Sequence, residues 1–207
     1  NDESNSGGRI SLPNMIFTGS AGTGKTTVAK LLGQLFLNLG LRTRNAFVEV
    51  SISDFAVGRT PSADTMNMKI NEADGGILCI DEPYLLCDSE DGKQALQVLI
   101  KRLEEKADNF TVILTGYSDK FAQLFKVNQG FKTRFTKTIN FKDYSEDQLF
   151  DIVVALADKE SLVLSSDAEI KISEYIASYA RRGGMSNGHG ANLLFNKILT
   201  NFEKRKS

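Results

Sequence analysis

The chain has 207 residues, of which 41% are hydrophobic, and its 25 lysines and arginines nearly balance its 26 aspartates and glutamates. This length suits one domain, or a domain with a small appended subdomain. A net charge of −1 gives no overall electrostatic footprint for nucleic acid or for an anionic membrane surface, and the sequence lacks the run of roughly 18 apolar residues that a membrane span needs. We therefore expect no membrane span and no nucleic acid among its partners.

The cysteine content points to a reducing compartment. Cys79 and Cys87 form neither a disulfide framework nor a metal-ligand spacing, and Cys79 lies in an apolar run where it serves as a small hydrophobic residue. We expect an intracellular location, either cytoplasm or the matrix or stroma of an organelle.

The first nine residues are polar and contain glycine and serine, a composition typical of a linker. The chain does not begin with Met, and we expect residues 1–9 to be a polar tail cut from a longer protein.

A phosphate-binding loop follows the first predicted strand. The strand is the short apolar run 15–18, and residues 19–26 then match the pattern GxxxxGK[ST]. In such a loop, glycines let successive backbone N–H groups point at one centre, where Lys25 reaches the β- and γ-phosphates and the Thr26 hydroxyl ligates Mg²⁺. The residues expected to contact the nucleotide are Gly19, Ser20, Ala21, Gly22, Thr23, Gly24, Lys25, Thr26 and Thr27. The alternative is a glycine-rich turn that binds nothing.

The helix predicted after this loop, 26–39, begins at the expected phosphate position. Its apolar residues recur at the spacing of one helical face, and Gly40 provides a stop. Backbone N–H groups and the dipole at a helix N-terminus attract anions, so the loop lies where its mechanism needs it.

Strands and helices alternate through the first 140 residues, which predicts a parallel sheet with helical crossovers. The further predicted strands are 46–50, 77–80, 111–115 and 138–141, and the further predicted helices are 63–73, 92–107 and 119–125. From Tyr144 the strand signal stops and three helices follow, the first opening with a capping box at residues 145–148. We therefore expect an α/β fold, a P-loop NTPase parallel sheet with flanking helices over 10–142, and a small all-α lid over 143–207.

Two carboxylates end the apolar strand 77–80. Ligands bind at the carboxyl ends of parallel strands, so Asp81 is a candidate for the Mg²⁺ shell and Glu82 for the general base that activates a water. The alternative is a surface Asp-Glu pair that starts a loop. Tandem carboxylates at this place favour a hydrolase over a small-molecule kinase, which must exclude water.

The next strand end and the following loop add polar candidates. Thr115 and Tyr117 end strand 111–115, where a hydroxyl would hydrogen-bond the γ-phosphate or the attacking water; a plain strand-ending turn is the alternative. Arg134 lies in the next predicted loop, and its planar guanidinium suits phosphate oxygens. An arginine in a basic loop is otherwise an ordinary surface residue.

Taken together, these motifs resemble an AAA+ ATPase of the CbbX/CfxQ/SpoVK type, which includes red-type Rubisco activases, sporulation proteins and type VII secretion components. The segments that carry the resemblance, in family order, are 14–29, 75–84, 112–117, 128–135 and 141–149. The resemblance implies a ring, commonly a hexamer, that uses ATP and Mg²⁺ to remodel a protein substrate or assembly partner. It makes Lys25 and Thr26 the Walker A residues, Asp81 and Glu82 Walker B, and Arg134 an arginine finger from the adjacent subunit. Thr115 to Tyr117 match the sensor strand.

The sequence departs from the family in two places. Segment 51–65 is shorter than the family's aromatic pore loop, and Phe55, its one nearby aromatic, either serves as the pore aromatic or packs in the core. In the lid, His189 and Asn192 occupy the places of two family arginines, the second of which is sensor 2. Arg181 and Arg182 either supply the missing charge or simply end a helix.

Three functions remain open from the sequence. The first is an active AAA+ ATPase that moves or assembles a protein partner. The second is an ATP-binding assembly or scaffold module that hydrolyses weakly because its sensor 2 and pore loop are impaired. The third is another P-loop enzyme, such as a nucleotide kinase or nucleic-acid motor, against which the Asp-Glu pair and the balanced charge argue.

Overall fold

The structure is a computed structural model that describes residues 12–55, 60–105, 109–181 and 186–206. The expected tail 1–9 and the candidate Arg182 lie outside these ranges. The chain divides into two compact units. We call residues 12–18 and 26–140 the sheet unit, and residues 19–25 and 141–206 the helical unit. Each unit is described by itself.

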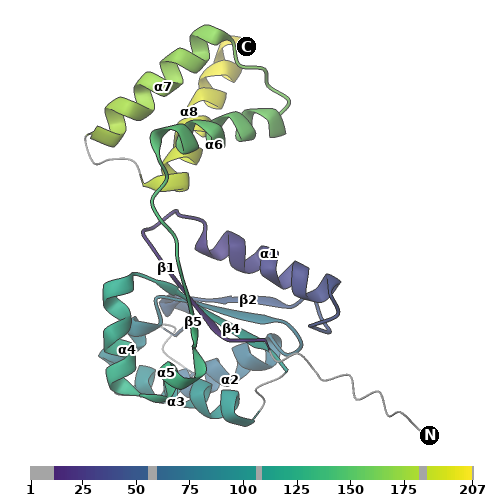
Figure 1. The fold of residues 1–207 in the computed structure, drawn as a ribbon, viewed down its shortest axis with the longest axis vertical. Coiled ribbons are helices and arrows are strands. Elements are labelled where there is room, and N and C mark those ends of the chain that lie inside the picture. Colours follow the sequence, from purple (N-terminus) through teal and green to yellow (C-terminus); the bar gives the residue numbers. More distant parts are fainter. Residues whose placement is uncertain (1–11, 56–59, 106–108, 182–185, 207) are drawn as a thin grey trace, which may run out of the picture. The chain divides into compact units, whose positions relative to one another are not determined.

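The sheet unit contains a five-stranded parallel sheet in the order β2-β3-β4-β1-β5 (Figure 1). Its strands are β1 (Met15–Thr18), β2 (Phe47–Val50), β3 (Ile77–Asp81), β4 (Thr111–Gly116) and β5 (Lys137–Asn140). In register, Asp81 pairs with Thr115, and Gly116 pairs with Thr18. The carboxyl ends of β3, β4 and β1 therefore lie at one edge of the sheet, as predicted for a parallel α/β fold.

Helices cover both faces of this sheet, α1 on one and α2 to α5 on the other (Figure 1). Their bounds are α1 (Lys25–Asn38), α2 (Ser62–Glu72), α3 (Glu90–Glu105), α4 (Phe121–Val127) and α5 (Gly130–Arg134), joined in part by 3-10 turns at Ile52–Phe55, Pro83–Asp88 and Ser118–Lys120. Buried strand residues such as Leu78, Ile80 and Leu114 form one core cluster with α2 and α3. On the other face, a Cβ added at Gly33 of α1 would lie 3.4 Å from Ile77. Strands buried on both faces explain the continuous apolar runs in the sequence.

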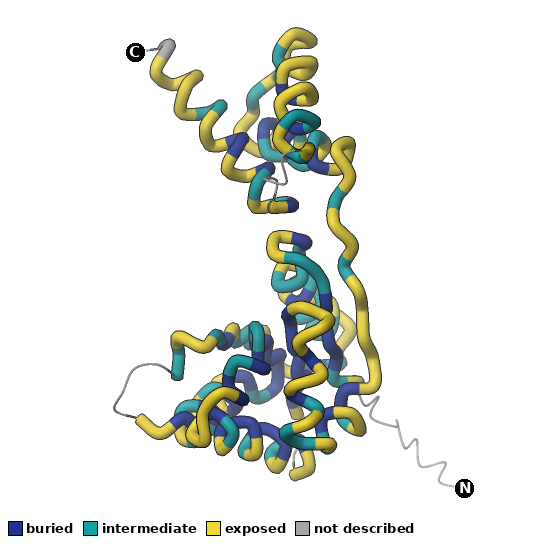
Figure 2. The backbone as a smooth tube through the Cα atoms, turned by 90° about the vertical axis from the view of Figure 1, so that its left-hand side faces the viewer, coloured by how far each residue is buried: buried dark blue, intermediate teal, exposed yellow. Residues whose placement is uncertain are grey.

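Burial is concentrated in β1, β3 and β4, whereas every residue of β5 is exposed; buried and exposed residues alternate along the helices (Figure 2). Each fully buried Leu, Ile or Phe side chain contributes about 1.5–3 kcal/mol. Cys79 and Cys87 are unbridged and buried, and desolvation by burial raises the pKa of Cys79 to about 12. The Cys79 thiol therefore stays protonated and packs as a small hydrophobic residue, as expected.

The helical unit contains α6 (Glu146–Lys159), α7 (Ser166–Arg181) and α8 (Asn187–Lys206). Apolar side chains from all three helices form its core: Leu149, Val153, Ala157, Ile172, Ile176, Ala191, Leu194 and Phe195. The predicted capping box is present at the start of α6, where the Ser145 hydroxyl accepts from the Gln148 N–H and the Gln148 side chain accepts from the Ser145 N–H. In the described part of the chain, every helix is too short or too polar to cross a lipid bilayer.

The predicted strands and helices are present with small shifts at their ends, and one placement is wrong. Arg134 was expected in a loop, but it is the last residue of the short helix α5. Five residues make little more than one helical turn, too few for a periodic apolar pattern to mark the helix in the sequence. The grouping of Gly19–Lys25 with the C-terminal helices was also not expected from the sequence.

Candidate functional site

The phosphate loop, Gly19–Lys25, has a backbone that only its glycines tolerate. Gly22 and Gly24 have φ values of 77° and 91°, which L side chains rarely adopt. A Cβ added at Gly22 would lie 2.6 Å from the Ser186 carbonyl oxygen, and one at Gly19 would lie 2.4 Å from that of Phe141. The glycine spacing of the motif is therefore required by both the conformation and the close approach of neighbouring backbone.

The positive charge of Lys25 lies within the curl of the loop. Its Nζ donates to the carbonyl oxygens of Gly19 and Ser20 at 2.9 and 2.8 Å, and the Thr23 hydroxyl donates to the same Ser20 carbonyl at 2.9 Å. Thr26 and Thr27 follow in the first turn of α1, the former half-buried and the latter exposed. This arrangement gathers an ammonium group and helix N-terminal N–H groups, which suits a polyanion.

Residues of the helical unit bind three carbonyl groups of the loop. The Tyr144 hydroxyl donates to Thr23 O at 3.2 Å, the Gly188 N–H donates to Gly22 O at 3.0 Å, and the Asn187 side chain donates to Ala21 O at 3.1 Å. These three hydrogen bonds tie the loop to residues 144, 187 and 188 of the same unit.

Asn187 is the centre of this network. It is buried, has a left-handed backbone with φ 48°, and uses its amide in three hydrogen bonds. Besides Ala21 O, its Nδ2 donates to Asp143 Oδ1 at 3.1 Å, and its Oδ1 accepts from the Tyr144 N–H at 2.9 Å. Sequence reasoning missed Asn187 and Tyr144 as site residues, although both lie in segments that match the family pattern.

The Asp81 carboxylate, at the end of β3, is bound by the neighbouring strand within the sheet unit. The Thr115 hydroxyl, which is fully buried, donates to Asp81 Oδ1 at 2.5 Å. In the structure, the Thr115 hydroxyl thus contacts Asp81. From the sequence, we expected this hydroxyl to contact the γ-phosphate or the attacking water, and that contact stays a prediction. The hydrogen bond orients the Asp81 carboxylate.

Glu82 follows with a strained backbone. Its φ of 48° is left-handed, which is rare for a residue with a side chain and is concentrated at functional sites. Its N–H donates to Thr115 O at 2.8 Å, and its Oε1 accepts from the Tyr84 hydroxyl at 2.9 Å. The Tyr117 ring is partly exposed, and it is the backbone N–H of Tyr117 that contacts the Tyr84 hydroxyl, at 3.2 Å.

Two residues of the sheet unit fit a magnesium ion. Mg²⁺ takes oxygen ligands and is usually held by one or two protein side chains together with waters and phosphate oxygens. The Asp81 carboxylate ends β3, is half-buried and is already bound as an acceptor by Thr115. The Thr26 hydroxyl stands in the first turn of α1. Both side chains offer the hard oxygen atoms that this ion prefers.

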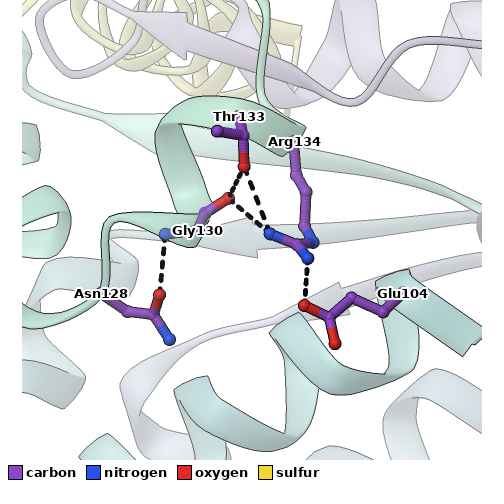
Figure 3. Close-up of polar contacts among 5 residues, drawn as sticks. All are labelled: Glu104, Asn128, Gly130, Thr133 and Arg134. Carbon is purple, nitrogen blue, oxygen red and sulfur yellow. Dashed lines mark hydrogen bonds and ion pairs between the residues drawn. The ribbon is translucent and has the colours of Figure 1, made fainter.

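Arg134 is held inside its own unit (Figure 3). Its guanidinium forms an ion pair with Glu104 and donates from Nη1 to Gly130 O at 3.1 Å and to Thr133 Oγ1 at 3.2 Å. Asn128 steadies the start of the same helix, because its Oδ1 accepts from the Gly130 N–H at 2.8 Å. The Arg134 side chain remains 24% exposed.

The aromatic candidate for a pore loop packs against the protein interior. Phe55 is half-buried at the end of the 3-10 turn Ile52–Phe55 and contacts the core cluster of the sheet unit. Residues 56–59, the rest of that candidate loop, lie outside the described residues. Of the two alternatives for Phe55, the structure favours packing.

The lid positions that replace the family arginines lie on α8. A Cβ added at Gly22 would lie 3.2 Å from the His189 Cβ, so His189 adjoins the phosphate loop. The Asn192 side chain instead donates to Gly188 O within the helix at 2.7 Å. Arg181 donates from Nε to Ala177 O at 3.1 Å, as a residue that ends a helix does.

Comparisons with known proteins agree with this geometry. Residues 15–143 match the family described as "ATPase family associated with various cellular activities (AAA)". Stage V sporulation protein K of Bacillus subtilis (strain 168) is 37% identical over 168 residues, which cover 78% of this chain and 52% of the relative. Protein CfxQ of Xanthobacter flavus is 35% identical over 180 residues, 84% of this chain and 56% of the relative. The chain thus spans about half the length of the curated relatives it matches.

A solved structure shares the fold. The crystal structure of the FIGL-1 AAA domain in complex with ADP superposes with a TM-score of 0.54 at 17% sequence identity, covering 70% of this chain and 48% of that one. At this identity the likeness concerns the fold alone.

Proposed function

Because the chain belongs to the AAA family of ATPases, in the CbbX/CfxQ/SpoVK-type branch, we propose that it hydrolyses Mg-ATP in an oligomeric ring and thereby remodels or assembles a protein partner. The observation that carries this proposal is the register of the sheet. The phosphate loop follows directly after Thr18, the last residue of β1. In the sheet, Thr18 pairs with Gly116 of β4. The residue before it, Thr115, pairs with Asp81 at the end of β3 and binds its carboxylate. The three strand ends supply the parts that hydrolysis needs.

Binding relies on the loop and on the helix that follows it. The N–H groups of the loop and of the first turn of α1 bind the phosphates, and Lys25 neutralises the β- and γ-phosphate oxygens. Thr26 and Asp81 are the residues that hold Mg²⁺, which supplies charge neutralisation on the phosphates when bound.

Hydrolysis relies on Glu82. A carboxylate that accepts a proton from a water makes that water a stronger nucleophile, and general bases of this kind contribute about 10²–10⁴-fold to the rate. Thr115 binds the Asp81 carboxylate through its hydroxyl and the Glu82 backbone N–H through its carbonyl oxygen, so one strand end holds both residues.

Arg134 acts on the nucleotide of an adjacent subunit. An arginine finger stabilises the charge that develops on the transferring phosphate. Within its own chain, the Arg134 guanidinium is bound to Glu104, whose side chain is more than half exposed. Exposed ion pairs contribute about 0–1 kcal/mol, so a neighbouring polyphosphate outcompetes this one carboxylate.

A second candidate function is an ATP-binding assembly module that hydrolyses weakly. Two observations favour it. His189 and Asn192 stand where the family has arginines, and Phe55 packs against the core instead of standing free as a pore aromatic. In this second function, the altered lid and the packed Phe55 weaken the coupling of hydrolysis to work and leave nucleotide binding in place.

A comparison of turnover and binding separates the two functions. We predict that Glu82→Gln lowers ATP turnover by about 10²-fold or more, because the amide cannot accept the proton, while the affinity for a fluorescent ATP analogue stays within twofold. The matched control is Glu160→Gln on the exposed end of α6, which keeps full turnover. The wild-type protein and Glu82→Gln are compared at concentrations where the oligomer forms. If the wild-type protein turns over ATP no faster than Glu82→Gln, it is not an active ATPase, and the second candidate function, an assembly module, is supported.

A further inference from the structure

A buried tyrosine links the end of β3, which carries the carboxylates, to the end of β4. Tyr84 belongs to the 3-10 turn Pro83–Asp88 and is only 3% exposed. Its ring meets Phe121 edge-on, with ring centroids 5.7 Å apart and an interplanar angle of 87°. Packing on this scale fixes the ring, so the phenolic oxygen occupies one place.

The phenolic oxygen makes two hydrogen bonds of opposite sense. It donates to Glu82 Oε1 at 2.9 Å and accepts from the Tyr117 N–H at 3.2 Å. Desolvation by burial, together with the neighbouring Glu82 carboxylate, raises the pKa of Tyr84, so the phenol keeps the proton that it donates. The result is a bridge from the carboxylate to the backbone at the end of β4.

Gly116 leaves the space for this bridge. A Cβ added at Gly116 would lie 2.8 Å from Tyr84 Cε1 and 3.0 Å from its hydroxyl oxygen. Every other residue type at position 116 therefore pushes the tyrosine away from its hydrogen-bond partners. This gives a common physical reason for two sequence features, the Tyr two residues after Glu82 and the Gly-Tyr pair that ends β4.

Glu82 needs such a restraint. A glutamate has three side-chain torsions, and without a partner its carboxylate samples many positions. The left-handed backbone of Glu82 sets the direction of its Cα–Cβ bond. The hydrogen bond from the Tyr84 hydroxyl sets the position of its carboxylate. The second oxygen of the carboxylate is the one with which Glu82 accepts a proton from water.

From this geometry we propose that Tyr84 is a positioning residue: its hydroxyl ties the Glu82 carboxylate to the end of β4 and holds it in the orientation that hydrolysis requires. This inference rests on the proposed function, in which Glu82 is the general base. Tyr84 touches neither nucleotide nor water in this account and acts through Glu82 alone. Its loss therefore lowers the rate of the chemical step and leaves nucleotide affinity unchanged.

The test is Tyr84→Phe, which removes the hydroxyl and keeps the ring against Phe121. We expect kcat for ATP to fall about tenfold, because misplaced catalytic groups lose rate at this scale, while KM and the affinity for a fluorescent ATP analogue stay within twofold. The matched control is Tyr175→Phe on α7, where the same hydroxyl is removed from a partly exposed ring, and kcat stays at the wild-type value. A wild-type kcat in Tyr84→Phe, or a rise in KM at unchanged kcat, overturns the inference.

Two further variants distinguish positioning from a general loss of structure. In Glu82→Gln the added Tyr84→Phe substitution changes the residual rate less than twofold, because Tyr84 acts through Glu82; a further tenfold fall overturns the inference. Gly116→Ala lowers kcat like Tyr84→Phe by displacing the ring. If Glu82→Gln keeps wild-type turnover, the proposed function itself is wrong. If Glu82→Gln loses turnover but Tyr84→Phe keeps it in full, only the inference about Tyr84 is wrong.

Discussion

The two halves of the candidate site are held in place by different means. At the end of β3, the Asp81 carboxylate and the Glu82 backbone N–H are bound by Thr115 of the adjacent strand, in a register set by backbone pairing. The phosphate loop is instead bound by residues from the far end of the sequence: Asn187 contacts Ala21 across 166 positions, and Tyr144 contacts Thr23 across 121. Strand register gives the carboxylates a rigid frame, whereas the loop depends on the packing of the helical unit.

The largest expected effect concerns Arg134, a residue of the sheet unit that we propose acts on the nucleotide of an adjacent subunit. We expect Arg134→Ala to lower kcat by about 10³-fold, the scale of an arginine finger. Lys25→Ala subunits still offer Arg134, and Arg134→Ala subunits still have an intact phosphate loop. Mixing the two inactive proteins therefore restores part of the ATP turnover, measured by phosphate release.

The control for this experiment is the double variant Lys25→Ala/Arg134→Ala, which restores nothing when mixed with Arg134→Ala. If neither mixture regains ATP turnover although oligomers are present, Arg134 does not act across the subunit interface.

A smaller effect is expected where the loop is tied to the helical unit. Asn187→Ala removes three hydrogen bonds of a buried amide and leaves its partners unsatisfied, at a cost of about 1–3 kcal/mol. We expect this loss in chemical denaturation and a higher KM for ATP, with kcat at saturating ATP near the wild-type value. This is the opposite pattern to Tyr84→Phe, which lowers kcat alone.

The matched control is Asn196→Ala on the exposed side of the same helix, which changes neither quantity. If Asn187→Ala has normal KM and normal stability, the contacts to Ala21 and Tyr144 do not support the loop.

The smallest effect tests whether the helical unit contributes only as a scaffold. Ser145→Ala removes the N-cap of α6, and the loss of such a cap costs about 1 kcal/mol of folding free energy. We expect this decrease in denaturation experiments and unchanged KM and kcat. Ser178→Ala, in the exposed part of α7, is the comparison and stays within about 0.5 kcal/mol of wild type. A catalytic defect in Ser145→Ala would show that the start of α6 does more than hold the helices together.

The sequence predicted the sheet and its polar edge because both leave local patterns. Apolar runs such as 77–80 mark strands buried on two faces, and the residues that follow each strand fall at one edge of a parallel sheet. The AAA fold with a helical C-terminal part is confirmed by the strand order and by the family match. The capping box at Ser145 was likewise visible, since its two partners are three residues apart.

The contacts between distant residues could not be predicted. No local pattern says that the amide of Asn187 meets the loop carbonyl of Ala21, or that the Tyr84 hydroxyl lies beside the N–H of Tyr117. Such hydrogen bonds follow from the tertiary fold, in which side chains satisfy whichever polar groups burial leaves near them. The hydrogen bond from the Thr115 hydroxyl to Asp81, its partner in register, could not be predicted for the same reason.

The central claim is that one region binds the nucleotide and the other hydrolyses it. The most direct test measures equilibrium ATP binding and ATP turnover on the same preparations of Lys25→Ala and Glu82→Gln. The account predicts that Lys25→Ala loses both binding and turnover, whereas Glu82→Gln binds ATP like the wild-type protein and does not turn it over. Turnover retained in Glu82→Gln, or binding lost in both variants to the same extent, would contradict it.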